Sequence, residues 1–476
     1  MNIRAFMDRV IRDYRVMFRT KSITDLHACC EGEHRLKRVL GPFELVLFGI
    51  GAIIGTGIFV ITGIAAATYA GPALVVSFII AGIVCLFAAL SYSEFAAMVP
   101  IAGSAYSYSY ASLGEIWAWI IGWDLILEYS VSVSAVAVGW SGYVTSLLAE
   151  AGVVLPASLV NPPGYHAGMI NLPAMIIISL ITLLLISGVR QSAAVNTVIV
   201  IIKIAIILLF LYLGFSHINP VNWSDFTPFG WSGVLAGAAI VFFAYIGFDA
   251  VSTMAEEVKD PQRDLPIGII VSLLICTLLY IAVAAVLTGI VPYTTLNTPA
   301  PVSSALMELG ISWGAALVSV GALMGITSVI LVLLFGQSRI FFAMSRDGLL
   351  PAVFREVSPR FHTPVRVTVF VGVVTALIAG FLPLQDIAQL VNVGTLAAFI
   401  IVSAGVIVLR RTRPEIPRPF RCPFVPLVPL LCMVSCAYLI WVLPTVTHLR
   451  FVIWLVIGLA VYLFYGMKHS RMAVTE

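Results

Sequence analysis

Residues 49–60 read GIGAIIGTGIFV, with four glycines in twelve positions. The stretch lies within an apolar run from about 43 to 67, which is long enough to cross a membrane as a helix. Closely spaced glycines weaken a helix because they carry the highest backbone entropy cost on folding. We therefore predict a transmembrane helix that is interrupted near Gly55, Thr56 and Gly57.

Residues 242–253 read FFAYIGFDAVST and repeat this feature in the sixth apolar run. The interruption falls around 244–248, and Asp249 follows it at a depth where a carboxylate is costly. The two interruptions lie five helices apart, and because five is odd the two helices run in opposite directions. We predict two inverted repeats of five helices, as in many secondary transporters. Taken singly, each interruption is equally explained by glycines that let neighbouring helices pack closely.

The composition of the whole chain also requires a membrane. Of the 476 residues, 61% are apolar and 10% are charged, against about 45–50% and 25% in soluble domains. A soluble enzyme is therefore excluded, and a net charge of +3 provides no basic surface for nucleic acid. We predict an all-α polytopic protein with twelve transmembrane helices, near 43–67, 71–97, 105–138, 172–188, 194–214, 233–257, 267–291, 314–344, 366–382, 387–409, 424–442 and 448–466.

The basic residues orient these helices. All 26 Lys and Arg residues except Lys203 and Arg450 fall on one side of the predicted map, and the positive-inside rule makes that side cytoplasmic. Both termini are then cytoplasmic, and the short tails favour a bacterial inner membrane. We expect a basic segment over 1–41, either an amphipathic helix on anionic lipid or a solvated tail. A transporter core over 42–409 and helices 11 and 12 with a short tail over 410–476 complete the chain.

Interrupted helices expose backbone groups that bind ions. Free N–H groups attract anions, and free carbonyl groups attract cations. The amides at Thr56 and Gly57 are therefore candidates for a carboxylate. Candidate carbonyls for an ammonium group belong to Ile53, Phe243, Ala244 and Ile246. A free α-amino acid carries both charges, and apolar side chains, Leu333 among them, would limit the size of its side chain.

Motifs for other activities are missing from the sequence. No CxxC, HExxH or GxxxxGK[ST] pattern occurs, so a thiol–disulfide site, a zinc protease site and an ATP-driven motor are unsupported. We predict no cofactor and no metal, and an ion gradient as the energy source. A channel is disfavoured because few ionisable residues lie at membrane depth.

Four stretches in this order resemble the amino acid–polyamine–organocation superfamily. They are GIGAIIGTGIFV at 49–60, EFAAMVPIAGSAYSYSYASLGEIWAWIIGWDLILEY at 94–129, FFAYIGFDAVSTMAEEVKDPQRDLPIGI at 242–269 and FFAMSRDGLLP at 341–351. The resemblance covers about residues 35 to 466. Within the superfamily, the sequence looks most like the twelve-helix bacterial members of the cationic amino acid transporter family, which share the leucine-transporter fold. This resemblance implies proton-coupled amino acid transport, with an L-amino acid and the lipid bilayer as partners.

The resemblance also implies roles for individual residues. The substrate backbone is bound at Ile53, Thr56, Gly57, Phe243, Ala244 and Ile246, and Glu128 lies near the substrate. Lys203 stands in helix 5 where sodium-driven relatives bind a cation, so no Na⁺ is expected. We hypothesise that Lys203 carries proton coupling and donates to carbonyls of the first interruption and to hydroxyls such as Thr327 or Ser328. The alternative is a permanently charged lysine that joins two helices.

The sequence also suggests roles for other charged residues and leaves some of them open. Glu128 either acts on the substrate or is held by hydrogen bonds that stabilise the interruption, with Asp124 on the same helix face. Asp249 is expected to cap the second half of helix 6. An inner-gate network is expected from Glu94, Arg339, Arg346 and Asp347. The sequence leaves open whether the substrate is cationic, such as arginine, or small and neutral, such as alanine, and whether the protein is a proton symporter or an amino acid or polyamine exchanger.

Overall fold

The computed structural model describes residues 17–21, 38–165, 167–298, 300–361, 363–382 and 384–471. Most of the basic segment predicted over 1–41, including any amphipathic helix in it, lies outside these residues. The secondary structure of the described residues is helical, with loops and turns between the helices, apart from the two-residue strand β1 (Ile170–Asn171), which pairs with residues 160–161. The prediction of an all-α protein is confirmed.

The helices follow the apolar runs of the sequence closely. The α-helices are α3 (Pro42–Ile53), α4 (Thr62–Ala65), α5 (Leu74–Met98), α6 (Ala105–Ser112), α7 (Glu115–Glu150), α8 (Ala157–Val160), α9 (Leu172–Ser187), α10 (Val189–Phe215), α11 (Gly230–Val241), α12 (Pro261–Ile290), α13 (Pro301–Glu308), α14 (Ser312–Arg346), α15 (Val365–Phe381), α16 (Leu384–Thr412), α17 (Leu427–Val442), α18 (Thr445–Val461) and α19 (Met467–His469). Shorter 3-10 and π turns connect them, namely η1 (Gly57–Ile61), η2 (Ala66–Ala70), η3 (Gly71–Ala73), η4 (Pro220–Trp223), η5 (Phe242–Tyr245), η6 (Asp249–Glu257), η7 (Tyr293–Thr295), η8 (Ala352–Arg355) and η9 (Tyr462–Gly466).

Eight helical stretches in the described part of the chain are long and apolar enough to cross a membrane. They are Pro42–Met98, Glu115–Ala149, Ser192–Phe215, Gly230–Glu257, Pro261–Ile290, Ser312–Arg346, Val391–Thr412 and Thr445–His469. Three shorter apolar helices are α9, α15 and α17. The protein is therefore an integral, multi-pass membrane protein.

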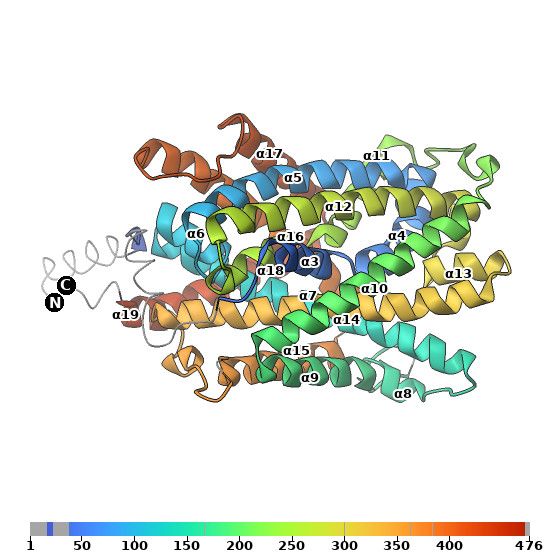
Figure 1. The fold of residues 1–476 in the computed structure, drawn as a ribbon, viewed down its shortest axis with the longest axis horizontal. Coiled ribbons are helices and arrows are strands. Elements are labelled where there is room, and N and C mark those ends of the chain that lie inside the picture. Colours follow the sequence, from blue (N-terminus) through green and yellow to red (C-terminus); the bar gives the residue numbers. More distant parts are fainter. Residues whose placement is uncertain are drawn as a thin grey trace, which may run out of the picture.

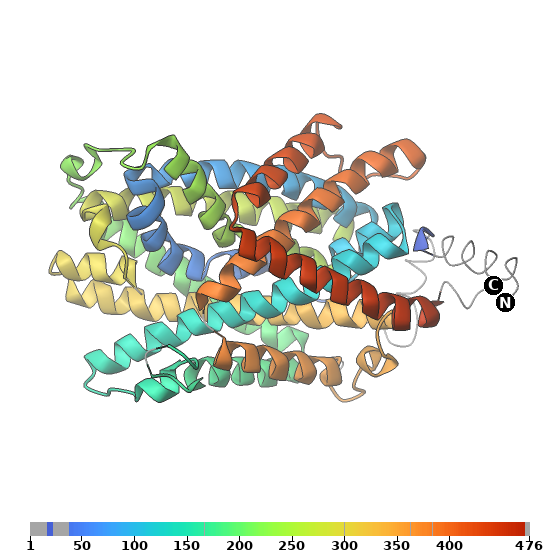
Figure 2. The ribbon, with the colours of Figure 1, turned by 180° about the vertical axis from the view of Figure 1, so that it is seen from behind.

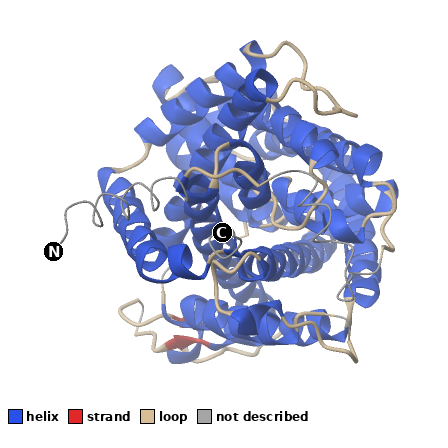
Figure 3. Ribbon diagram, turned by 90° about the vertical axis from the view of Figure 1, so that its left-hand side faces the viewer, coloured by secondary structure: helices blue, strands red, loops and turns tan. Residues whose placement is uncertain are grey.

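Most of the long helices lie side by side along the longest axis of the molecule (Figure 1). Helix α12 packs on α5 and α3, and α14 packs on α7 and α10, so α3 lies inside the bundle. The end-on view in Figure 3 shows the helices arranged around this interior, with β1 at the periphery. The reverse view in Figure 2 shows that residues 17–21 and helix α19 lie at the same end of the bundle. We call this the terminus-bearing end.

One predicted helix is divided in two. The run expected over 105–138 breaks between α6 and α7, because Gly114 has a φ of +106° that interrupts the helical backbone. Helix α7 then continues to Glu150, beyond the predicted end at 138, and the short helix α8 follows it. The glycine signal was present in the sequence, but the apolar run around it concealed the division.

Candidate functional site

The first predicted interruption is present in the chain. Helix α3 ends at Ile53, and Ile54 is extended, with φ −79° and ψ 104°. The chain becomes helical again in η1, a π-helical turn that begins at Gly57. Such turns are frequent at functional sites. The carbonyl end of α3 and the N–H end of η1 therefore lie within a few residues of each other.

The second interruption is present as well. Helix α11 and the 3-10 turn η5 lead to Ile246, which is extended with ψ 134°. Gly247 follows with a φ of +115°, a conformation that other residues rarely adopt. The chain resumes as the 3-10 helix η6 at Asp249.

The two interruptions touch each other through their glycines. A Cβ atom at Gly57 would lie 2.4 Å from the Cα of Ala244, and a Cβ at Gly247 would lie 2.9 Å from the Cβ of Ala52. These distances are too short for any side chain larger than hydrogen. Close approach therefore brings the free backbone groups of both interruptions to one place in the bundle.

The first interruption supplies the hydrogen-bond donors where the two interruptions meet. The first N–H groups of η1 have no acceptor within their own helix. Thr56 stands immediately before them and is 5% exposed, and its Oγ1 has no hydrogen-bond partner among the described residues. An anionic group is therefore favoured here.

The acceptor side is bridged by a residue that the sequence did not single out. The hydroxyl oxygen of Tyr280, on α12, lies 2.7 Å from the carbonyl oxygen of Ile53 and 2.8 Å from that of Ala244. The carbonyl of Phe243 accepts the N–H of Ile246 at 3.3 Å. Each carbonyl oxygen has a second lone pair for an ammonium group. The only sequence signal for Tyr280 was a tyrosine in the middle of an apolar helix.

A cavity of about 10 Å³ lies where the two interruptions meet, enough for roughly one water molecule. Its lining consists of Ala52, Ile53, Gly55, Thr56, Gly57, Ser132, Val136, Phe243, Ile246, Val329 and Leu333. Leu333 and five of the predicted substrate-binding residues are in this lining. Ala244 lies behind Gly57 instead, and Glu128 is outside. The sequence missed Ser132, Val136 and Val329, although Ser132 is one helical turn from Glu128 on the same face of α7.

Lys203 reaches the first interruption from α10. Its Nζ lies 2.9 Å from the carbonyl oxygen of Ile50, 3.2 Å from that of Gly51, 2.9 Å from that of Ile54 and 2.8 Å from Ser328 Oγ. The predicted contacts to these carbonyls and to Ser328 are therefore present. Thr327 is not among the hydrogen-bond partners of Lys203; its Oγ1 accepts the indole N–H of Trp140 at 3.1 Å and donates to the carbonyl of Leu323 at 2.7 Å.

Three buried carboxyl groups lie near the site but outside the cavity lining. Both oxygens of Asp124 and both oxygens of Glu128 lack a hydrogen-bond partner among the described residues. Asp249 Oδ2 accepts the hydroxyl of Tyr129 at 2.8 Å. Asp249, which was expected to cap the second half of helix 6, lies in the first turn of η6, and the N-cap position belongs to Phe248. The other carboxylate oxygen of Asp249, Oδ1, has no hydrogen-bond partner among the described residues.

The terminus-bearing end is closed by ion pairs. Arg339 pairs with Glu257 at 2.8 Å, and both side chains are almost fully buried. Arg346 pairs with Glu256 at 3.1 Å. Sequence spacing could not identify these partners, which come from η6, 82 and 90 positions away along the chain.

Asp347 joins more distant parts of the chain at the same end. Lys21 Nζ lies 2.7 Å from its Oδ1, and the Tyr106 hydroxyl donates to its Oδ2 at 2.8 Å. Burial, and then the negative charge of Asp347, raise the pKa of Tyr106 well above its usual value, so the phenol remains a donor. Glu94 lies in a separate cluster with Arg410, so the four residues predicted as one gate network divide into several pairs.

Comparison with known proteins gives consistent results. The family model for amino acid permeases matches residues 40–464. The chain is 52% identical over 460 residues to the branched-chain amino acid permease of Bacillus subtilis, covering 96% of this chain and 99% of that protein. It is 54% identical over 455 residues to the methylthioribose transporter of the same organism, covering 95% and 98%. A vacuolar cationic amino acid transporter of Arabidopsis thaliana is 40% identical over 407 residues, covering 84% and 68%.

These matches agree with a site built from two interrupted helices in a bundle of apolar helices. They also agree with the superfamily that the four sequence stretches resemble. The protein is thus a transporter and not an enzyme, and the chain belongs to the amino acid permease family of the amino acid–polyamine–organocation superfamily.

Proposed function

We propose that this permease takes up L-amino acids together with protons by alternating access. The observation that carries the proposal is that Ile53, Thr56 and Gly57 at the start of η1 line one cavity, and that the carbonyls of Ile53 and Ala244 both lie against the Tyr280 hydroxyl. This arrangement offers N–H donors to a carboxylate and carbonyl acceptors to an ammonium group. Ile53, Thr56, Gly57, Phe243, Ala244 and Ile246 would hold the substrate backbone, and Phe243 would cover it.

Lys203 is the proposed site of proton coupling. Its ammonium group holds carbonyls of three residues at the end of α3, and a buried ammonium is costly unless it is fully hydrogen-bonded. Loss of its proton would remove this cation from the first interruption and weaken the position of α3. In this way the proton and the substrate would act on the same short segment.

The lining favours neutral apolar side chains. It contains no Asp or Glu, and α7 and α14 contribute Val136, Val329 and Leu333. The cavity must widen before it admits an amino acid, and these apolar side chains are the ones that would move. Glu128 lies one helical turn from Ser132, so a cationic side chain would reach it only in a widened cavity.

The topology that we propose for this transporter has twelve membrane crossings in a leucine-transporter-like arrangement, with inverted repeats over helices 1–5 and 6–10. The stretch Pro42–Met98 is 57 residues long, which is enough for two crossings at about 20 residues each. The basic residues at the terminus-bearing end support a cytoplasmic position for both termini, in the inner membrane of a bacterium.

The test is uptake of radiolabelled leucine, alanine, arginine and methylthioribose into proteoliposomes. Each substrate is measured with and without an inward proton gradient, and with and without internal amino acid. Accumulation of leucine or alanine driven by the gradient in vesicles without internal amino acid is the expected result. Uptake only with internal amino acid would establish the alternative, an exchanger on the same fold in which Lys203 is structural. Preference for methylthioribose, which has neither a carboxylate nor an ammonium group, would overturn the backbone-recognition argument.

A further inference from the structure

A groove at the terminus-bearing end is separate from the transport site. It has a volume of about 480 Å³ and lies between the first turns of α12 and the loop that joins α16 to α17. Asp260 and Arg263 stand on the α12 side, and Phe420 stands on the loop side. A groove of this volume is large enough for a small-molecule ligand.

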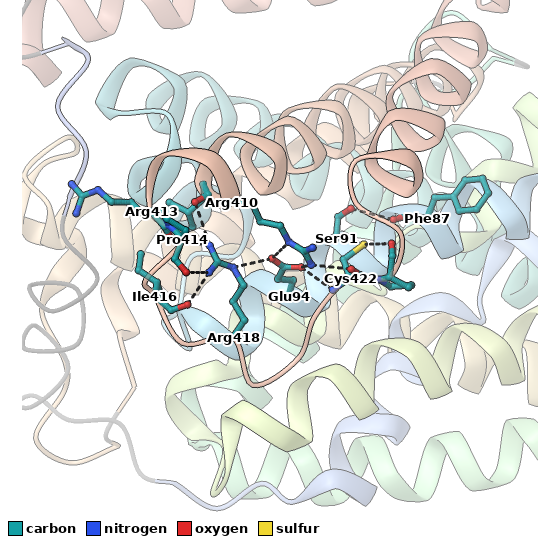
Figure 4. A network of polar contacts seen from close by, with 11 residues as sticks. Phe87, Ser91, Glu94, Arg410, Arg413, Pro414, Ile416, Arg418 and Cys422 are labelled. Carbon is teal, nitrogen blue, oxygen red and sulfur yellow. Dashed lines mark hydrogen bonds and ion pairs between the residues drawn. The ribbon is translucent and has the colours of Figure 1, made fainter.

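The loop side of the groove is held firmly. Glu94 lies on α5 and is 2% exposed. Its carboxylate accepts hydrogen bonds from Arg410 Nη2 at 2.6 Å and from the backbone N–H of Cys422 at 2.7 Å. Arg418 lies 3.4 Å from the other carboxylate oxygen and donates to the carbonyl of Ile416 at 2.8 Å (Figure 4). These contacts fix the chain on both sides of Phe420. The groove wall is therefore preorganised.

The groove presents one positive and one negative side chain. Arg263 and Asp260 are both exposed, and neither forms an ion pair with the side chains that the structure describes. They are three positions apart at the start of α12, so they lie on neighbouring parts of its surface. A zwitterion with a phosphate and a primary ammonium would neutralise both charges.

The apolar part of the groove continues along the outside of α12. Ile267, Ile270 and Val271 line the groove, and Leu274 and Leu278 follow on the same face, 46% and 68% exposed. From Ile267 to Leu278 the helix rises by about 17 Å, close to the roughly 15 Å hydrocarbon depth of one leaflet. A polar groove that opens onto an apolar strip of this length matches the shape of a phospholipid.

We propose that this groove binds phosphatidylethanolamine from the adjacent leaflet. Arg263 holds the phosphate, Asp260 holds the ethanolamine ammonium, and an acyl chain lies along Ile267, Ile270 and Val271. The lining carries no net charge, which favours a zwitterionic headgroup over phosphatidylglycerol, whose phosphate would remain beside Asp260.

The test is native mass spectrometry of the purified, delipidated full chain titrated with dioleoyl phosphatidylethanolamine or dioleoyl phosphatidylglycerol. The wild type is expected to bind the ethanolamine lipid about tenfold more tightly than the glycerol lipid. Arg263→Gln is expected to weaken ethanolamine lipid binding by about tenfold, because a charge-assisted contact is lost. Asp260→Asn is expected to make the two lipids bind equally. Asp260 makes no side-chain capping bond, so this variant leaves the start of α12 intact.

Arg360→Gln is the matched control. Arg360 is an exposed arginine in the loop between η8 and α15, outside the groove, and its removal should leave both affinities unchanged. The proposal is overturned if Arg263→Gln binds the ethanolamine lipid as the wild type does, or if the wild type prefers the glycerol lipid. No substrate enters these measurements, so they stand or fall independently of the uptake assay.

Discussion

The two helix interruptions face the same cavity, but different chemistry stabilises them. At the first, the ammonium group of Lys203 lies against the carbonyls of Ile50, Gly51 and Ile54. At the second, the hydrogen-bond donors are neutral hydroxyl groups: the hydroxyl of Tyr280 donates to the carbonyl of Ala244, and the hydroxyl of Tyr129 donates to Asp249. A lysine can change its charge during a transport cycle, whereas a tyrosine hydroxyl keeps its proton near neutral pH. Under the proposed mechanism, the first interruption would respond to a proton gradient and the second would keep a constant shape.

Among the substitutions that test this comparison, replacing Lys203 should have the largest effect on transport. Lys203→Met removes the charge and its four close polar contacts, and hydrogen bonds to charged groups are worth about 1.5–3 kcal/mol each. We expect gradient-driven accumulation in proteoliposomes to fall by roughly 100-fold or more. Exchange of labelled for unlabelled substrate at equal pH should persist, because it needs no net proton movement.

Lys468→Met is the control for that variant, since Lys468 is an exposed lysine on α19. Size-exclusion chromatography would verify that both variants remain folded. Full uphill accumulation by Lys203→Met would remove the coupling role and leave Lys203 as a tie between α10 and α3.

Separating the two interruptions should have the next largest effect. In Gly57→Ala the new Cβ would lie 2.4 Å from the Cα of Ala244, which is backbone and cannot rotate away. Overpacking of this kind costs about 1–3 kcal/mol, so we expect substrate affinity, measured by scintillation proximity binding, to weaken roughly 30-fold. Gly142→Ala is the matched control, because nothing lies within 4 Å of a Cβ at Gly142. Equal affinities of the two variants would mean that contact between the interruptions is unimportant for binding.

The sequence was sufficient for the position of both interruptions but not for how they are stabilised. Glycines within apolar runs identified Gly57 and Gly247, and a lone charge within helix 5 identified Lys203. Tyr280 was missed because a tyrosine in an apolar run has the same pattern as a packing residue. Its importance follows from two carbonyls, one of them 227 positions away along the chain. Periodicity reports local structure, and it contains no information on which distant groups meet.

The same reason explains the charged residues at the terminus-bearing end. The sequence identified Arg339, Arg346 and Asp347, but their partners Glu257, Glu256 and Lys21 depend on how η6 and residues 17–21 fold against α14. The division of the third apolar run at Gly114 was missed for a different reason. A single positive φ ends a helix, whereas an average over apolar residues continues across it.

Removing the bridge between the interruptions should have a moderate effect. Tyr280→Phe leaves the carbonyls of Ile53 and Ala244 without the hydroxyl that lies 2.7 and 2.8 Å from them. A buried acceptor without a partner costs about 1–3 kcal/mol, so we expect substrate affinity to weaken by roughly tenfold. Tyr462→Phe is the control, because this buried tyrosine donates to Glu115 at 2.9 Å, at the terminus-bearing end. Affinity that is unchanged in Tyr280→Phe would show that the two interruptions are held independently of each other.

Glu128→Gln should have the smallest effect, and it tests where the substrate site ends. Glu128 is outside the cavity lining, and its carboxyl oxygens have no hydrogen-bond partner among the described residues. The amide of Gln has the same shape, so we expect leucine and alanine uptake to remain within about twofold of the wild type, since no contact worth more than about 0.4 kcal/mol is removed. Arginine uptake, if the wild type transports it, should fall more strongly, because only a cationic side chain would need the carboxylate in a widened cavity. A tenfold loss of leucine affinity would instead show that Glu128 acts on the substrate backbone, and that α7 contributes to recognition as directly as the two interruptions do.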